Sequence, residues 1–227
     1  MCVRYITAIW DEIVTWCYGG IELTDIKYGL LYNWYAATDS RNICPIGWHV
    51  PTDIEWGTLA TYLGGQLVAG GKLKETGLVY WNTPNTGATN EVGFNARGSG
   101  QRNPDGSFTN IKIGNRTWAS NASNDWECNR NNATLANATG ISEKYGCALR
   151  PIKDSTILTH GQTGIYIDPS GVAYRTICIG TQEWVADNII TKHYRNGDPI
   201  PEVPLAAGWI VLETGAWCYF NNDSGYM

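Results

Sequence analysis

The density of turn-forming residues between Gly70 and Gly114 limits what this chain of 227 residues can fold into. Glycine, asparagine, proline and threonine recur there every few positions, and the stretch Asn103–Gly106 reads NPDG. Glycine supplies positive φ angles and proline removes a backbone donor, so neither a long helix nor a long central strand fits this pattern. We therefore expect a long loop region that contains only short strands.

The amino-acid composition is that of a folded domain. Hydrophobic residues make up 43% and charged residues 16% of the chain, which is globular rather than disordered. The formal net charge is −5 and no Lys/Arg cluster occurs, so we expect no nucleic-acid partner. No apolar run is long enough for a membrane span, and the first residues, MCVRYITAIWDEIV, show no signal-peptide pattern.

One helix is clearly predicted over residues 51–65. Thr52 is suited to the N-cap and Glu55 to the third helical position, the two partners of a capping box. Gly64 and Gly65 then end the helix. The spacing i, i+3, i+4, i+7 gives one apolar face, made of Trp56, Leu59, Ala60 and Leu63. A second, weaker helical turn is possible in residues 30–39, where the aromatic residues suit a strand equally well.

Strand signals lie toward the C-terminus. Residues 145–154 read as a closing strand in which Pro151 favours an edge or an end. Residues 164–189 read as a hairpin around an Asp-Pro-Ser-Gly turn, with a further strand after Gly-Thr-Gln. One helix, short strands and many turns together predict an α+β fold.

The cysteines and histidines show no metal-site spacing. The seven cysteines are an odd number without a C-x-x-C pair, and the three histidines are widely separated. Scattered buried thiols are expected, and no cofactor. Cys44 and His49 lie five residues apart, but a nucleophilic pair would also need a third, orienting group, so a structural role is expected for His49. Calcium is an alternative, with oxygen atoms from Asp39, Asp53, Asn90, Glu91 and Asp105.

Four stretches carry a family resemblance: YGLLYNWYA (28–36), CPIGWHVPTDIEW (44–56), GGKLKETGLVYWNTPNTGATNEVGFNA (70–96) and RNPDGSF (102–108). They resemble the Fibrobacter succinogenes major paralogous domain, a repeat family of Bacteroidetes and their phages. The resemblance covers about residues 16–154 as one module and about 165–222 as the opening part of another. It implies a C-type-lectin-like fold with one clear helix, a small twisted antiparallel sheet and long irregular loops. Formylglycine-generating enzymes and the variable proteins of diversity-generating retroelements also use that fold.

The resemblance also bears on the cysteines. The family's late cysteine falls on Pro151 here, so Cys44 lacks the partner that the family implies. Cys147 lies four residues earlier and is an alternative partner of unknown geometry.

Residues 115–137 include seven asparagines and little aliphatic material. In the variable proteins that the family resembles, diversified residues lie at the corresponding place near the module's end. Asparagine tolerates turns and offers a donor and an acceptor, and Asn, Ser and Trp together are typical of antibody binding loops.

We expect a ligand-binding face here, and a merely solvated loop is the alternative. Trp118 and Trp126 would frame the face. Its polar contacts would come from Arg116, Asn121, Ser123, Asn124, Asp125, Glu127, Asn129, Arg130, Asn131 and Asn132. The apolar framework would be Tyr32, Trp34, Trp48, Trp56, Leu59, Leu63 and Trp81.

The expected function is therefore binding rather than catalysis. The resemblance implies a receptor-binding or adhesion module on a Bacteroidetes cell surface or a phage virion, with a surface glycan or protein as partner. One alternative is a structural fibre or assembly module without a ligand. A remote alternative, by fold analogy, is a formylglycine-generating-type oxidase with a copper ion held by Cys128 and Cys147.

The order of segments suggests two parts. Residues 1–154 would form a module that lacks its opening strands, and 155–227 the opening segment of a module. That segment would complete a sheet in the same chain or in a neighbouring copy, the latter giving a homo-oligomer. A weak internal repeat supports this order, because ITAIWDEIVTWCYGG (6–20) resembles AAGWIVLETGAWCYFNN (206–222).

Overall fold

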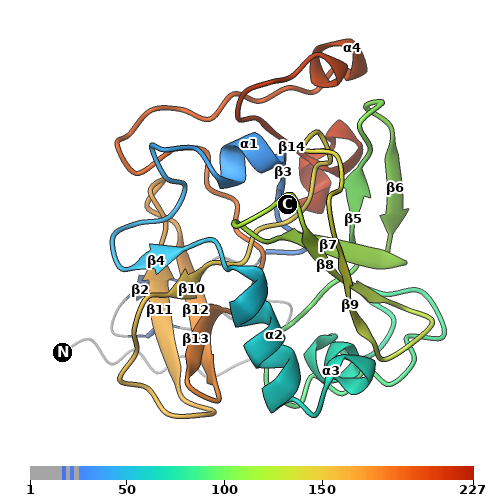
Figure 1. Cartoon of the computed structure of the whole chain (residues 1–227), viewed down its shortest axis with the longest axis vertical. Coiled ribbons are helices and arrows are strands. Elements are labelled where there is room, and N and C mark those ends of the chain that lie inside the picture. Colours follow the sequence, from blue (N-terminus) through green and yellow to red (C-terminus); the bar gives the residue numbers. More distant parts are fainter. Residues whose placement is uncertain (1–16, 19–20, 23–25) are drawn as a thin grey trace, which may run out of the picture.

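The fold is α+β, with short helices and mostly antiparallel strands (Figure 1). The computed structural model describes residues 17–18, 21–22 and 26–227, with side chains from Ile26 onward. The described α-helices are α1 (Trp34–Ala37), α2 (Asp53–Tyr62), α3 (Gln66–Leu73) and α4 (Ala206–Ile210). Two 3₁₀ turns follow at Phe220–Asn222 and Ser224–Tyr226. None of the helices described is long and apolar enough to cross a membrane.

Two five-stranded sheets form the body. The first has the order β11 (Thr163–Ile167), β12 (Ala173–Ile179), β13 (Gln182–Val185), β10 (Ile152–Lys153) and β4 (Trp48–His49). The second has the order β6 (Phe108–Ile111), β5 (Ser99–Arg102), β7 (Gly114–Trp118), β8 (Asp125–Asn129) and β9 (Leu135–Ala138). Two-stranded pairs are β14 (Trp217–Cys218) with β3 (Leu31–Tyr32), and β1 (Cys17–Tyr18) with β2 (Ile21–Glu22).

Helix α2 confirms the prediction made for residues 51–65. The Thr52 side chain accepts a hydrogen bond from the Glu55 backbone amide, and the Glu55 carboxylate accepts one from the Thr52 amide at 2.8 Å. The predicted apolar face is buried. Trp56 packs against Trp184 with ring centroids 4.7 Å apart, so this helix face joins the core shared by both sheets.

Helix α3 is an unexpected element, because it begins before and runs into the region predicted as loop. Gly70 and Gly71 lie inside the helix, where glycine lowers helix propensity. Their missing side chains permit close packing: a Cβ atom on Gly70 would lie 2.2 Å from the Thr134 carbonyl oxygen, and one on Gly71 would lie 2.4 Å from that of Gly87. The same glycines that argued for a loop thus let the loops at 87 and 134 rest on the helix.

The ambiguous segment 30–39 contains both structures that its sequence allowed. Leu31–Tyr32 form β3, and Trp34–Ala37 form the single turn α1. Asn33 separates them, since its side chain accepts a hydrogen bond from the Ala36 amide at 3.0 Å and caps the turn.

The predicted hairpin over 164–189 is confirmed. Strands β11 and β12 pair antiparallel across the Asp168–Gly171 turn, and β13 follows. Asp168 stabilises the turn by accepting hydrogen bonds from the amides of Ser170 and Val172. The closing strand expected at 145–154 is much shorter, because only Ile152–Lys153 form β10. Pro151 immediately precedes β10, which lies between β13 and β4 rather than at an edge.

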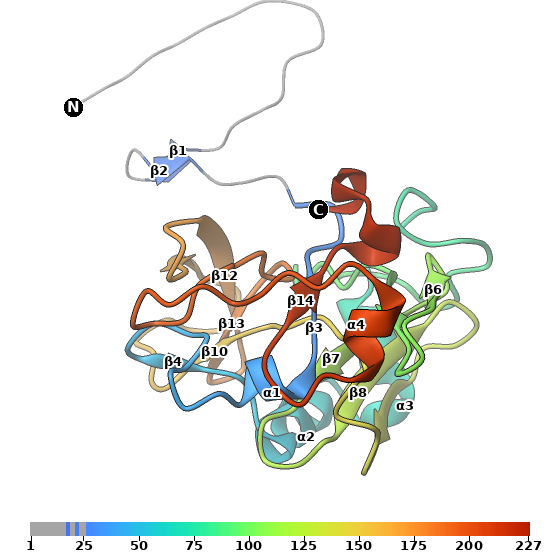
Figure 2. The same ribbon diagram turned by 90° about the horizontal axis from the view of Figure 1, so that it is seen from above.

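Residues on both sides of position 154 share sheets within one chain. β13 pairs with β10 in the first sheet, and β14 pairs with β3 (Figure 2). The second copy of the internal repeat thus supplies α4 and β14. Of the first copy, the structure describes only Cys17–Tyr18, which pair with β2 rather than with β3.

The expected apolar framework is largely buried. Trp34 is the exception, since it is only partly buried and donates from Nε1 to the carbonyl oxygens of Ala119 and Ala122. Six of the framework residues are buried: Tyr32, Trp48, Trp56, Leu59, Leu63 and Trp81. Within residues 26–227, the cysteines are buried and unpaired, as expected of scattered thiols: Cys44, Cys128, Cys147, Cys178 and Cys218.

Candidate functional site

The two tryptophans predicted to frame a binding face are core residues, so that prediction is wrong. Trp118 and Trp126 are 0% and 4% exposed. Their side chains point to opposite faces of the β7–β8 pair, because Trp118 lies opposite Asp125 and Trp126 opposite Thr117. Each face is covered at that end: Trp118 donates to the Tyr32 carbonyl oxygen at 2.8 Å, and Trp126 stacks on Trp56 of α2.

Most asparagines of the segment 115–137 have local structural partners. The Asn121 side chain accepts from the Asp53 amide at 2.9 Å, at the start of α2. Asn124 is buried, donates to the Asp53 carboxylate and accepts from the Gly140 amide. Asn129 accepts from the amide two residues ahead, as is usual for a turn. The prediction that Asn124 makes ligand contacts is therefore wrong, since both ends of its amide are occupied inside the protein.

The remaining predicted contact residues differ in exposure. Asn121, Asn131 and Asn132 are exposed. Asn132 nevertheless accepts from the Thr134 amide at 3.0 Å. Five others are half-buried: Arg116, Ser123, Glu127, Asn129 and Arg130. The structure thus gathers only part of the predicted set at the surface.

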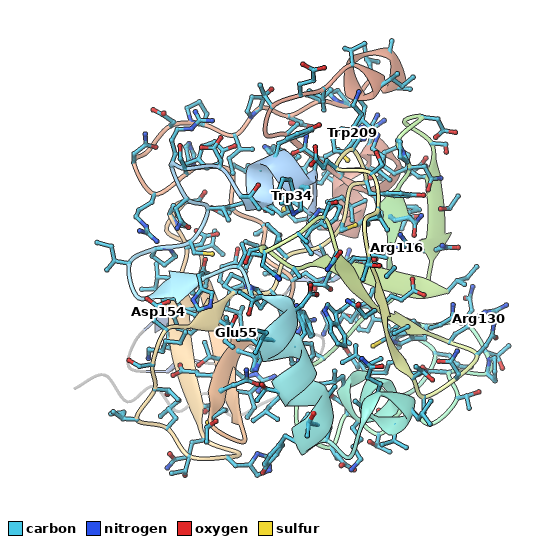
Figure 3. All side chains as sticks on the ribbon, viewed as in Figure 1. Trp34, Glu55, Arg116, Arg130, Asp154 and Trp209 are labelled. Carbon is cyan, nitrogen blue, oxygen red and sulfur yellow. The ribbon has the colours of Figure 1, made fainter. Side chains whose placement is uncertain are left out.

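Three predicted residues form a charged cluster on one face of β7 and β8: Arg116, Asp125 and Glu127. The strand register places Arg116 opposite Glu127, and the alternation of β8 turns Asp125 to the same face. Arg116 Nε lies 3.3 Å from Asp125 Oδ2 and 3.3 Å from Glu127 Oε2. Figure 3 labels Arg116 on this part of the sheet. The guanidinium carbon also lies 5.1 Å from the centre of the Tyr145 ring, a contact that no sequence signal predicted.

The side chains of the charged cluster make no hydrogen bond with any other described residue. The Asp125 side chain is fully buried, while those of Arg116 and Glu127 are 20% and 35% exposed. Polar groups in such positions normally have hydrogen-bond partners, and an exception calls for an explanation. Here the guanidinium and both carboxylates keep donors and acceptors that the protein does not use.

Three other buried cations in the described part of the chain each donate three hydrogen bonds. Lys74 Nζ donates to three backbone carbonyl oxygens at 2.8–2.9 Å, those of Thr86, Asn129 and Asn132. Arg102 donates to the carbonyl oxygens of Gly106, Val203 and Pro204. Arg150 donates to Asn188 Oδ1 and to the carbonyl oxygens of Phe94 and Asn95. These three cations thus have hydrogen-bond partners inside the protein, whereas the charged groups of the cluster have none outside the cluster.

Burial dominates the electrostatics of the charged cluster. It raises the pKa of Asp125 to about 6, against the lowering effect of Arg116 and with a further rise from Glu127. Asp125 is thus largely ionised at neutral pH in an unfavourable environment. Such strained ionisation is common at functional sites.

The residues considered for nucleophilic and metal chemistry have the following surroundings. His49 Nδ1 lies 2.6 Å from Asp154 Oδ1 and Nε2 lies 2.8 Å from Glu55 Oε1, so neither ring nitrogen is free for a nucleophile or a metal. Burial raises the pKa of Cys44 to about 12, which keeps the thiol protonated. In residues 26–227 no group of three His, Cys, Asp or Glu side chains is placed to hold a metal ion. Cys128 and Cys147, considered for copper, belong to different core clusters.

The comparisons with known proteins agree with the resemblance at the level of the family. A sequence model of the Fibrobacter succinogenes major domain matches residues 10–153, which span α1 to α3 and the whole charged cluster. No curated protein and no solved structure was found to match. The matched residues make up more than half of the chain. This chain belongs to the Fibrobacter succinogenes major domain family.

Proposed function

We propose that this protein is a ligand-binding module that acts in adhesion or receptor binding rather than in catalysis. The ligand would bind on the face of β7 and β8 that carries the charged cluster. The module would have a C-type-lectin-like fold and would be displayed on a Bacteroidetes cell surface or a phage virion. Its partner would be a surface glycan or protein.

The observation that carries this proposal is the lack of hydrogen bonds in the charged cluster. An unsatisfied charged group that is buried or half-buried costs about 1–3 kcal/mol or more. Arg116 and Glu127 are partly exposed, so a bound molecule can reach them. A ligand that supplies the missing partners recovers this free energy on binding, which is how a prepared binding site gains affinity.

Exposed asparagines support a second part of the proposal, that the segment 115–147 is diversified. Asn121 precedes β8, and Asn131 and Asn132 follow it, so exposed residues flank the strand. The neighbouring DNA tests this directly. A near-copy of the codons for 115–147 beside a reverse transcriptase gene is expected, and its absence would count against diversification.

The binding function can be tested with labelled full-length protein on intact Bacteroidetes cells and on arrays of surface glycans and proteins. Arg116→Gln and Glu127→Gln each remove one charge from the cluster. A matched control is Lys72→Gln. Lys72 lies on α3, away from this face, and forms an ion pair with Glu91. We expect wild-type and control protein to bind alike, and each cluster variant to bind at least about tenfold more weakly, because hydrogen bonds to charged groups contribute about 1.5–3 kcal/mol. Equal binding by all variants, or no binding by wild type, would contradict the proposal.

A further inference from the structure

We infer that the charged cluster selects an uncharged, hydroxyl-rich ligand, that is, a neutral glycan. This inference rests on the proposed binding function and names the chemistry of its ligand. It starts from Arg116, whose Nε atom lies between the two carboxylates while its Nη atoms donate to no described residue. Glu127 presents a half-exposed carboxylate beside this guanidinium. A donor and an acceptor thus lie side by side, which matches a hydroxyl group, since a hydroxyl can accept from one and donate to the other.

The charges of the cluster disfavour an ionic ligand. An anion that approaches Arg116 also meets the carboxylates of Asp125 and Glu127, and a cation that approaches Glu127 meets Arg116. Either ion must disrupt pairs of 3.3 Å that already exist. A neutral hydroxyl group forms its hydrogen bonds with these pairs intact, so it loses nothing to repulsion.

The charged residues nearest along the chain to Tyr145 do not alter this balance. Lys144 Nζ donates to the Ile210 carbonyl oxygen at 2.7 Å, which directs the ammonium group toward α4. Glu143 lies beside the Tyr35 hydroxyl. Neither residue therefore adds a free charge beside Arg116 and Glu127.

The surroundings of the cluster favour a glycan over a protein partner. Protein interfaces depend on apolar or aromatic anchors that are desolvated on binding. In the described part of the chain, none of the exposed large hydrophobic side chains belongs to β7, β8 or β9: Ile46, Ile54, Tyr62, Leu67, Val68, Leu78, Val79, Ile157, Ile167, Leu205, Ile210 and Val211. The small Ala136 lies opposite Glu127, and the half-buried Tyr145 ring flanks Arg116. A polar surface beside one aromatic ring suits a sugar ring with its hydroxyl groups and its apolar C–H face.

Asp125 acts in this arrangement as a positioning residue. Its side chain is fully buried, so it cannot touch the ligand, but its carboxylate forms an ion pair with Arg116 and so fixes the position of the guanidinium. Asp125→Asn should therefore weaken binding without changing which glycans bind, whereas Arg116→Lys keeps the charge and loses the planar fork of donors. The two variants separate positioning from direct contact.

A binding array with neutral, sialylated, sulfated and amino-sugar oligosaccharides, together with peptides, tests the inference. We expect the strongest binding to neutral oligosaccharides, with little change between about 0.05 M and about 0.5 M NaCl because screening does not affect an uncharged ligand. Arg116→Lys should bind them at least about tenfold more weakly. Thermal unfolding of each variant shows whether it is folded.

The outcomes separate the inference from the proposed function. Strongest binding to sulfated or sialylated glycans, to amino sugars or to peptides, weakened by Arg116→Lys, overturns the inference and leaves the binding function standing. The same holds for a steep dependence on salt. Failure of the wild-type protein to bind any probe overturns the proposed function, and the inference with it.

Discussion

The charge of the Asp125 carboxylate opposes folding, because burial favours the neutral acid. Its pKa is about 6 in the folded chain, because of burial, and 3.8 is its ordinary value. The folded state therefore holds this proton more tightly than the unfolded state does, so the stability falls as pH rises from about 4 to about 6. A shift of about two pKa units corresponds to about 3 kcal/mol.

Asp125→Asn should therefore stabilise the protein at neutral pH. We expect the free energy of unfolding at pH 7 to rise by about 1–3 kcal/mol and its decrease between pH 4 and 6 to become smaller. Urea unfolding across this pH range measures both, with Lys72→Gln on α3 as the control outside the charged cluster. A gain in stability that accompanies weaker ligand binding is the mark of a residue kept for function. A variant less stable than wild type at pH 7 would show instead that Asp125 serves the fold.

His49 links stability to pH in a different range. Its pKa is raised above 6.5, mainly by the hydrogen bond to Glu55 and also by Asp154. A raised folded-state pKa means that the stabilisation is complete below pH 6.5 and is lost as pH rises through the folded value. We expect wild type to lose up to about 1 kcal/mol over this range, as is usual for partly exposed ion pairs. His49→Gln should remove that loss. Thermal unfolding of both proteins between pH 6 and 9 measures this effect. An identical pH dependence of stability in wild type and His49→Gln would refute the link.

Helix α2 and the asparagine-rich segment depend on each other through Asp53. The Asp53 carboxylate accepts from Asn124, from Trp126 Nε1 at 2.8 Å and from Asn137 at 3.3 Å. Its own amide donates to Asn121. Hydrogen bonds to Asp53 thus connect the first turn of α2 with strands β8 and β9.

A matched pair of asparagines tests this connection. Asn124→Ala removes two hydrogen bonds and leaves their partners in a buried position, so we expect a loss of about 1–3 kcal/mol in the free energy of unfolding. Asn131→Ala should cost less than about 0.5 kcal/mol, because this side chain is exposed. Urea unfolding of both variants gives the comparison. Small and equal effects would mean that the Asn124 contacts contribute little.

These elements also show what the sequence could and could not predict. The start of α2 was predictable, because Thr52 and Glu55 lie three residues apart and bond to each other. The roles of the asparagines were not, since Asn121 and Asp53 lie 68 residues apart in sequence. Similarly, Gly70 and Gly71 look like loop residues until the loops packed against α3 are known. Strands β7 and β8 were not predicted within the asparagine-rich segment, and only the fold shows that Trp118 and Trp126 are covered on their respective faces.

The two halves of the chain fold into shared sheets and shared core clusters. Trp184 of β13 packs on Trp56, and Trp217 of β14 lies opposite Tyr32. These residues contribute large apolar surfaces that the first 154 residues would otherwise leave uncovered.

Deletion of residues 160–227 should consequently leave a protein that is insoluble or unfolds at a much lower temperature. The loss removes the partner strands of β10 and β3 and exposes their edges. Thermal unfolding and light scattering of the 1–159 fragment, beside the full chain, measure the effect. A fragment that is soluble, monomeric and equally stable would show that the C-terminal segment is not required.

The binding face itself is best tested by amide hydrogen exchange over the full chain, with and without the oligosaccharide that binds most strongly on the array. This measurement surveys every segment at once and needs no mutation. We predict slower exchange in the ligand-bound protein at residues 114–118 and 125–129 and around Tyr145. Slower exchange confined to segments away from these strands, with none at the charged cluster, would contradict the account.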